Sequence, residues 1–265
     1  MHQRSNDCNS VKAIKHICKY INKGSDMAVV EINNAATGVS DEIASLSDGK
    51  FPTKSASDLI SIPSEFCVPV PYLQELIRHV FPDISNKYKD PHWLCERAVL
   101  APKNENVNKI NNVFLKKLPG NTSTYKSVNA VMDKEQAAYY PAECLNFLNP
   151  PGMPPHMLNL KVGSSNMLLR NLDSPKFCNG TRDCVSKIMA NVIQATILTG
   201  NNKGDSVFIP RIPLILSDMP FVFKRPQFPV RLAFAIAINK APSQSLKVAG
   251  INLETTCWPI LWCMF

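Results

Sequence analysis

The stretch Arg231–Glu254, "RLAFAIAINKAPSQSLKVAGINLE", places the strongest constraint on the fold of this 265-residue chain. An apolar run leads into a polar turn that carries Lys240 and Gln244, and a second apolar run follows. Short apolar runs bounded by turn residues are typical of buried strands. Because a turn at the end of a core strand often holds a ligand, the stretch predicts two core strands joined by a candidate binding turn.

The rest of the chain favours an α/β fold. A buried strand is expected at 97–102, with a helix at 71–81 before it and a helix ending at Leu118 after it. A further helix is expected at 133–148. Runs rich in branched residues and bounded by Gly, Pro or Asn predict strands at 158–172, 192–200, 205–215 and 230–240. These elements suggest an α/β layer with a small all-β insertion.

The N-terminal region has a different pattern. In residues 8–24 apolar side chains recur at spacings of three and four, which predicts an amphipathic helix that ends at Gly24 and has lysines on its other face. Residues 31–58 lose this periodicity and are rich in small and polar residues. That composition predicts a linker.

Charge and cysteine content narrow the class of protein. The net charge of +8 suits a polyanionic partner such as nucleic acid, and it suits a solvated basic surface equally well. The nine cysteines follow no zinc-binding spacing, which favours free thiols in a reducing compartment. The N-terminus is polar and the apolar runs are shorter than a membrane span, so we expect an intracellular soluble protein without a membrane partner.

No motif in the sequence assembles a complete active site. The glycine-rich phosphate loop, the dinucleotide-binding glycine pattern and the serine nucleophile motif are absent from these 265 residues. The five histidines are scattered, without the spacing of metal ligands. We therefore expect neither a cofactor site nor a metal site in this chain.

Several long segments, in a fixed order, resemble one family. They are "WLCERAVLAPKNENVNKINN", "YPAECLNFLNPPGMPPHMLNLKVGSSNMLLRNLDSPKFCNGTR", "VFIPRIPLI" and "FKRPQFPVRLAFAIAINKAPSQSLKVAGINLE". Together they resemble the C-terminal half of Pif-type (petite integration frequency) ATP-dependent DNA helicases, in the form carried by Helitron transposable elements. The resemblance covers about residues 45–254. It implies an incomplete RecA-like second helicase domain, of the P-loop NTPase type, with an inserted small β-rich, SH3-like module called 2B.

The N-terminal helix resembles the end of the Helitron replication-initiator nuclease. That nuclease uses two tyrosines one helical turn apart, and here Tyr20 stands at the second position while His16 occupies the first. Tyr20 is therefore interpreted as a remnant of a nuclease site. The resemblances divide the chain into an initiator-like remnant and linker (1–44), part of the RecA-like domain (45–124), the 2B domain (125–172), a β-rich remainder returning to the RecA-like core (173–254) and a divergent tail (255–265).

The resemblance also implies an activity and its loss. Intact helicases of this family use ATP and Mg²⁺, and an arginine of the second RecA-like domain stabilises the transferring phosphoryl group. The chain passes from the initiator-like piece directly into the second domain and ends in "TTCWPILWCMF", so we expect no ATP hydrolysis and no unwinding by the chain alone. The expected remaining capacity is binding of single-stranded DNA.

The candidate DNA-binding residues come from the same resemblance. The binding turn corresponds to a family segment that contacts the DNA strand; here Ala237 replaces a hydroxyl residue and Pro242-Ser243 replaces Gln-Gly. The candidates for phosphate or base contacts are Lys240, Gln244, Arg170, Arg182, Arg225 and Arg231. The candidate stacking partners are Phe177, Phe223 and Phe228.

Two alternatives stay open at this stage. The β-rich module can serve as a non-catalytic interaction module for an intact helicase or another protein, or the chain can be a transposon remnant without function. From the family we also expect a nuclear location and an association with DNA repair, recombination and telomere maintenance.

Overall fold

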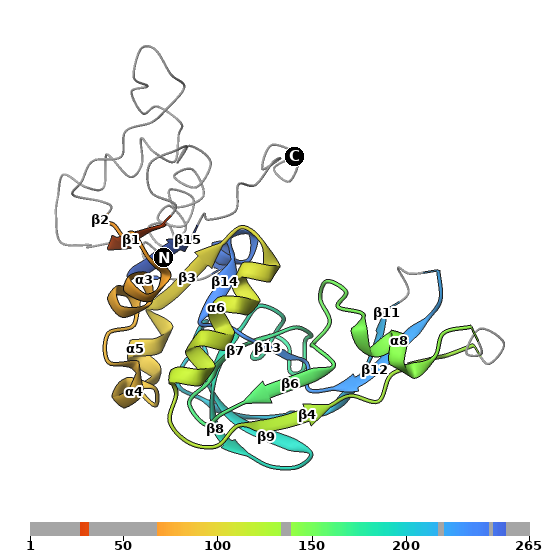
Figure 1. The fold of residues 1–265 in the computed structure, drawn as a ribbon. Coiled ribbons are helices and arrows are strands. Elements are labelled where there is room, and N and C mark those ends of the chain that lie inside the picture. Colours follow the sequence, from red (N-terminus) through yellow and green to blue (C-terminus); the bar gives the residue numbers. More distant parts are fainter. Residues whose placement is uncertain (1–26, 32–67, 134–138, 217–219, 244–245, 253–265) are drawn as a thin grey trace. The chain divides into compact units, whose positions relative to one another are not determined.

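The computed structural model describes residues 27–31, 68–133, 139–216, 220–243 and 246–252. The chain divides into two compact units, of which the second comprises Tyr88–Pro91 and Leu115–Ala233 and the first comprises the remainder (Figure 1). In sequence, the second unit is thus an insertion into the first. The expected class, α/β with an inserted β-rich module, is confirmed. The predicted helix at 8–24, Tyr20 and the predicted linker after residue 31 lie outside the described residues.

A five-stranded sheet forms the centre of the first unit, in the order β14-β3-β15-β1-β2. Strand β3 pairs in parallel with both β14 and β15, while β1 pairs antiparallel with β15 and with β2. The parallel trio with a helix after β3 is consistent with part of a RecA-like fold. The strands are β1 (Met27–Glu31), β2 (Val68–Pro69), β3 (Arg97–Ala101), β14 (Ala235–Ala237) and β15 (Val248–Asn252).

Four helices accompany this sheet in the sequence, and a cluster of aromatic rings forms the core. Phe81 lies edge-on to Trp93, Phe114 and Phe234, with ring centroids 4.8 to 5.9 Å apart. The helices predicted at 71–81 and up to Leu118 are confirmed, and two short helices that the sequence did not predict lie between them. The helices are α3 (Leu73–Val80), α4 (Ile84–Lys87), α5 (Pro91–Cys95) and α6 (Asn104–Lys117).

Gly250 of β15 allows close packing of α3 on the sheet. A Cβ atom at this position would meet Val80 Cγ2 at 2.6 Å and Leu76 Cδ1 at 3.2 Å. Because both side chains are buried, neither can move without displacing the core.

We therefore expect Gly250→Ala to lower the free energy of unfolding by about 1–3 kcal/mol through overpacking. Urea denaturation followed by circular dichroism measures this loss. The double variant with Val80→Ala removes the facing methyl groups, so it should lose less stability than the sum of the two single variants. Additive losses would show that the Val80 contact is not the cause.

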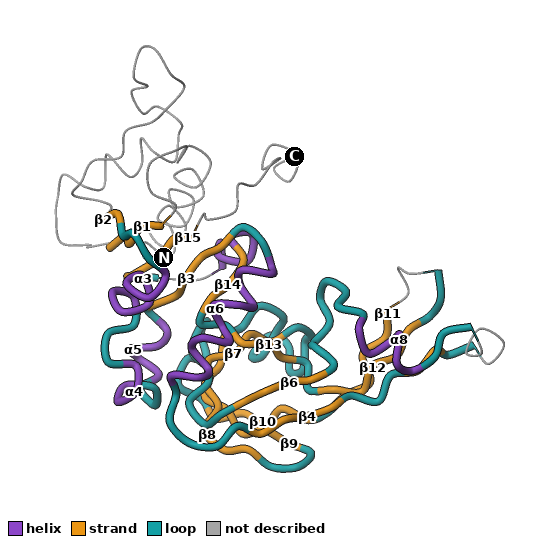
Figure 2. The backbone as a smooth tube through the Cα atoms, in the orientation of Figure 1, coloured by secondary structure: helices purple, strands orange, loops and turns teal. Residues whose placement is uncertain are grey.

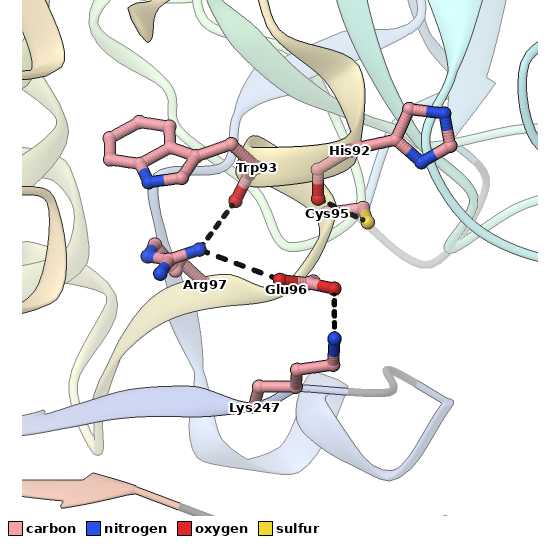
Figure 3. Close-up of polar contacts among 6 residues, drawn as sticks. All are labelled: His92, Trp93, Cys95, Glu96, Arg97 and Lys247. Carbon is pink, nitrogen blue, oxygen red and sulfur yellow. Dashed lines mark hydrogen bonds and ion pairs between the residues drawn. The ribbon is translucent and has the colours of Figure 1, made fainter.

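Charged side chains link the amino ends of β3 and β15 (Figure 3). The Glu96 carboxylate forms an ion pair with Lys247 and lies 3.6 Å from Arg97 Nη1. The same Arg97 nitrogen donates to the Trp93 carbonyl at 3.2 Å, and its guanidinium lies over the Trp93 ring. In addition, the Glu96 carbonyl accepts hydrogen bonds from the backbone N–H groups of Lys247 and Val248. This edge of the sheet is thus occupied by structural contacts.

The second unit is built mainly from strands, as the orange segments of Figure 2 show. Its largest sheet is fully antiparallel, in the order β10-β9-β8-β7-β13, and its smaller sheets are β11-β12-β5 and β4-β6. The strands are β4 (Ser123–Lys126), β5 (Ala130–Val131), β6 (Met157–Leu160), β7 (Ser165–Leu168), β8 (Arg182–Ile188), β9 (Val192–Ile197), β10 (Ser206–Pro210), β11 (Ile212–Leu216), β12 (Phe223–Gln227) and β13 (Val230–Leu232).

The structure corrects the sequence analysis of several of these elements. The runs predicted as strands at 158–172 and 205–215 each contain two strands of different sheets, β6 with β7 and β10 with β11. The single strand predicted at 230–240 is two strands, β13 and β14, which belong to different sheets. The chain leaves one sheet after Leu232 and joins the other at Ala235, and the buried residues between them keep the apolar run continuous. Within the predicted range 133–148, the structure describes the helix α8 (Ala142–Phe147).

Among the described residues, no helix has both the length and the apolar character needed to cross a membrane. Four cysteines fall within these residues, and none of the four forms a disulfide: Cys95, Cys144, Cys178 and Cys184.

Candidate nucleic-acid interface

The predicted binding turn follows the carboxyl end of β14. Strand β14 lies beside β3 with Ala237 paired in parallel to Ala101, so the two strands end at the same edge of the sheet. After β14 the chain forms a 3-10 helix, Ile238–Ser243, in which Lys240 is exposed. After β3 it places an exposed Lys103 just before α6. We call Lys103 and Lys240 the carboxyl edge of the first unit.

The sequence analysis did not select Lys103. The sequence pattern around Lys103 is the same as that around Lys240, because each is a lysine in the polar turn that follows a buried strand. What the sequence did not reveal was that the two strands are parallel neighbours. Gln244, the other candidate in the binding turn, lies outside the described residues.

Arg225 on β12 is buried completely, which corrects its assignment as a DNA contact. Its guanidinium donates to Asn129 Oδ1 at 2.9 Å and to the Pro154 carbonyl at 2.9 Å. It also donates to the carbonyls of Leu145 and Leu148, each at 3.0 Å. Burial and the nearby Arg231 lower the pKa of Arg225 to about 10, so the group remains charged at neutral pH. Arg225 therefore holds the loop around α8 in place.

Arg182 is likewise completely buried, so its assignment as a DNA contact is also corrected. One of its guanidinium nitrogens lies 3.4 Å from Ser165 Oγ, and its neighbour Asp183 is buried as well. Burial raises the pKa of the Asp183 carboxyl to about 7, although a hydrogen bond from Asn166 and the charge of Arg182 lower it. These groups stabilise the β7–β8 pair and are not available to a bound strand.

Arg170 and Arg231 are partly exposed and remain candidates. Arg231 donates to the Met153 carbonyl at 2.7 Å and to Asn149 Oδ1 at 2.9 Å, and burial lowers its pKa. Arg170 donates to the carbonyl of Leu169 at 3.2 Å.

The predicted stacking partners belong to the hydrophobic core of the second unit. Phe177, Phe223 and Phe228 are all buried, so none offers a ring face to a base. Other aromatic side chains of this unit are exposed. The sequence did not single them out, because their neighbours in the chain are no more polar than those of the buried aromatic residues. They include Phe147 of α8 and Phe208 of β10, with exposed fractions of 89% and 62%.

A cavity of about 560 Å³ lies beside α8, and we call it the α8 pocket. It falls within the size range of small-molecule sites, about 300–1,000 Å³. A network of polar side chains borders it: Asn129 Nδ2 donates to Asn146 Oδ1 at 2.7 Å, Ser127 Oγ donates to Asn129 Oδ1 at 2.8 Å, and His156 Nδ1 lies 2.9 Å from Ser127 Oγ. Its lining includes Glu143, Asn146, Phe147, Asn149, His156 and Met157.

The described residues do not suggest a metal centre, since no three His, Cys, Asp or Glu side chains among them gather in one place. Burial, followed by the charge of Asp183, raises the pKa of the Cys184 thiol to about 12, so this thiol is not a nucleophile at neutral pH. The described residues place cations and hydrogen-bond donors on the surface. Such groups suit recognition of an anionic ligand.

Comparison with known proteins gives one family match. Residues 143–188 match the family model described as the 2B domain of the DNA helicase Pif1. This range covers α8, its pocket and strands β6 to β8. No curated protein matches the chain.

Several solved structures resemble the chain in part. Unliganded Pif1 from Bacteroides sp is 24% identical, with a TM-score of 0.41, over 60% of this chain and 45% of that one. Pif1 from Candida albicans is 21% identical, with a TM-score of 0.42, over 65% and 46%. Bacteroides Pif1 bound to single-stranded DNA is 23% identical, with a TM-score of 0.39, over 63% and 40%. The chain thus spans less than half the length of each of these proteins, and its match to the Pif1 family model is limited to residues 143–188.

Proposed function

We infer that this chain binds the phosphate backbone of single-stranded DNA at its carboxyl edge and hydrolyses no ATP by itself. The observation that carries the inference is the placement of Lys103 and Lys240, both exposed after neighbouring parallel strands. Ligands of open α/β sheets bind outside the carboxyl ends of parallel strands. Lysines there attract a phosphate backbone, and the net charge of +8 favours the same partner.

The match of residues 143–188 to a helicase domain supports this choice of ligand. The absence of a phosphate-loop motif from these 265 residues supports the lack of ATP hydrolysis. The finer assignments remain part of the proposal: an origin from a Helitron element, a nuclear location and a link to DNA repair or recombination.

We expect Lys240→Ala and Lys103→Ala each to weaken binding of a labelled single strand several-fold. Fluorescence anisotropy over a range of salt concentrations measures the effect. Each lost phosphate contact should reduce the slope of log affinity against log salt by about 0.7. Lys247→Ala is the matched control, because Lys247 is an exposed lysine at the amino end of the same sheet. Equal losses in all three variants would mean that the carboxyl edge is not the site.

A second candidate function is docking of a protein partner on the β11–β12–β5 sheet. Ile215 and Lys224 are paired directly and therefore share one face of this sheet. Ile215 on this face and Met132, just beyond β5, are each 51% exposed. Binding that persists at high salt would favour this function, because apolar docking does not release counterions.

A further inference from the structure

Two amide side chains that line the α8 pocket are oriented by hydrogen bonds inside the chain. Asn146 Oδ1 accepts from Asn129 Nδ2 at 2.7 Å, and Asn149 Oδ1 accepts from Arg231 Nη2 at 2.9 Å. These bonds hold each oxygen toward its donor and leave the NH2 groups of Asn146 and Asn149 as donors for a ligand.

His156 adds an acceptor. Asn129 Oδ1 accepts from Arg225 Nε, a group that can only donate, and this fixes which end of the Asn129 amide is oxygen. Ser127 Oγ donates its one proton to this oxygen at 2.8 Å and lies 2.9 Å from His156 Nδ1, so it accepts from Nδ1–H, and Nε2 of the neutral ring is left as an acceptor. Burial and the charges of Arg225 and Lys126 lower the pKa of His156, which keeps the ring neutral at pH 7.

An aromatic face and two cations complete the surroundings of the pocket. Phe147, which lines it, is 89% exposed. Lys126 lies directly opposite the pocket residue Met157 in the β4–β6 pair and is exposed, and Arg211 donates to the Lys126 carbonyl at 3.0 Å. Glu143 is the one acidic residue that lines the pocket.

We propose that the α8 pocket receives one base of a bound single strand and prefers the keto bases thymine and guanine. The base stacks on Phe147, and Lys126 holds the adjacent phosphate. The NH2 groups of Asn146 and Asn149 meet the keto oxygen, and His156 Nε2 accepts from the ring N–H beside it, which thymine and guanine carry and which adenine and cytosine lack. Thymine presents O4 as an acceptor and guanine presents O6 and N7, whereas adenine and cytosine present an amino donor at the corresponding position. Lys126 and Arg211 attract a phosphate group, which a nucleotide carries and a protein side chain lacks. The charges therefore favour a nucleotide as the ligand. This inference rests on the proposed binding of single-stranded DNA.

The test compares the affinity of the full chain for thymidine, adenosine and cytidine oligonucleotides of equal length by fluorescence anisotropy. We expect tighter binding of the thymidine strand, and a loss of about tenfold in that affinity on Phe147→Ala, as is typical of a lost stacking contact. Phe208→Ala is the matched control, since Phe208 is an exposed aromatic residue of the same unit that does not line the pocket. It should change the affinity less than twofold.

A second variant tests the donors separately from the ring. Asn149→Asp keeps an acceptor for Arg231 but replaces the pocket donor by an acceptor, so the ratio of thymidine to adenosine affinity should fall toward one. Binding that is equal for all three strands and unchanged by Phe147→Ala would overturn the pocket while leaving the carboxyl-edge proposal intact. Failure to bind any strand would overturn both.

Discussion

Replacing Arg225 by alanine is expected to unfold the second unit or to lower its free energy of unfolding by at least about 3 kcal/mol. The guanidinium is completely buried and donates to four acceptors, which are the carbonyls of Leu145, Leu148 and Pro154 and the side chain of Asn129. Alanine would remove all four hydrogen bonds. Asn129 Oδ1 and the Leu145 carbonyl keep a second donor, in Ser127 Oγ and the Leu148 N–H, whereas the carbonyls of Leu148 and Pro154 lose the donor that Arg225 supplies, and each buried unsatisfied group costs about 1–3 kcal/mol. Urea denaturation followed by circular dichroism measures the loss.

Two further variants locate the cause of that effect. Arg225→Lys keeps the charge but lacks the planar fork, so it should recover only part of the lost stability. Lys224→Ala alters the neighbouring cation, which is half-exposed on the other face of β12, and should change the stability by less than about 0.5 kcal/mol. Wild-type stability of Arg225→Ala would contradict the role that we assign to this residue.

The stability of the chain is expected to fall as the pH rises from about 4 to 8 because of Asp183. Its pKa in the folded chain is about 7, against 3.8 for the exposed group. The folded state thus binds the proton more tightly, so the stabilisation is complete below pH 4 and is lost as the pH passes 7.

The surroundings of Asp183 support this direction. Its Oδ2 atom and Asn166 Oδ1 both lack a hydrogen-bond partner among the described residues, and the two residues lie directly opposite each other on β7 and β8. A proton on Asp183 supplies the donor that this pair lacks.

The free energy of unfolding in urea, measured at pH 5 and pH 8, checks this prediction. Asp183→Asn should abolish most of the difference between the two values, because the amide does not titrate. Asp173→Asn, at an exposed position of the same unit, should leave the difference unchanged. If Asp183→Asn retains the full pH dependence, another group is responsible.

Much of the fold was predictable because short-range patterns report burial. The apolar runs predicted the strands at 97–102 and 192–200, and periodicity predicted the helix at 71–81. Strand β12 was missed because "FKRPQ" alternates an aromatic residue with cations and a proline, a pattern that is typical of a surface segment. Only pairing with β11 and β5 explains it.

The sequence was sufficient to predict the α/β class, the β-rich insertion and the position of Lys240 in a turn after a core strand. Which cations reach solvent depends on tertiary packing. The acceptors of Arg225 lie between 71 and 96 residues away from it in the chain, and no local pattern reveals that they converge on one guanidinium. Likewise, Lys103 joined the candidate site only because β3 and β14, which are far apart in sequence, pair in parallel and end at one edge. Periodicity records whether a residue faces the interior, whereas the partner that it meets there depends on long-range pairing.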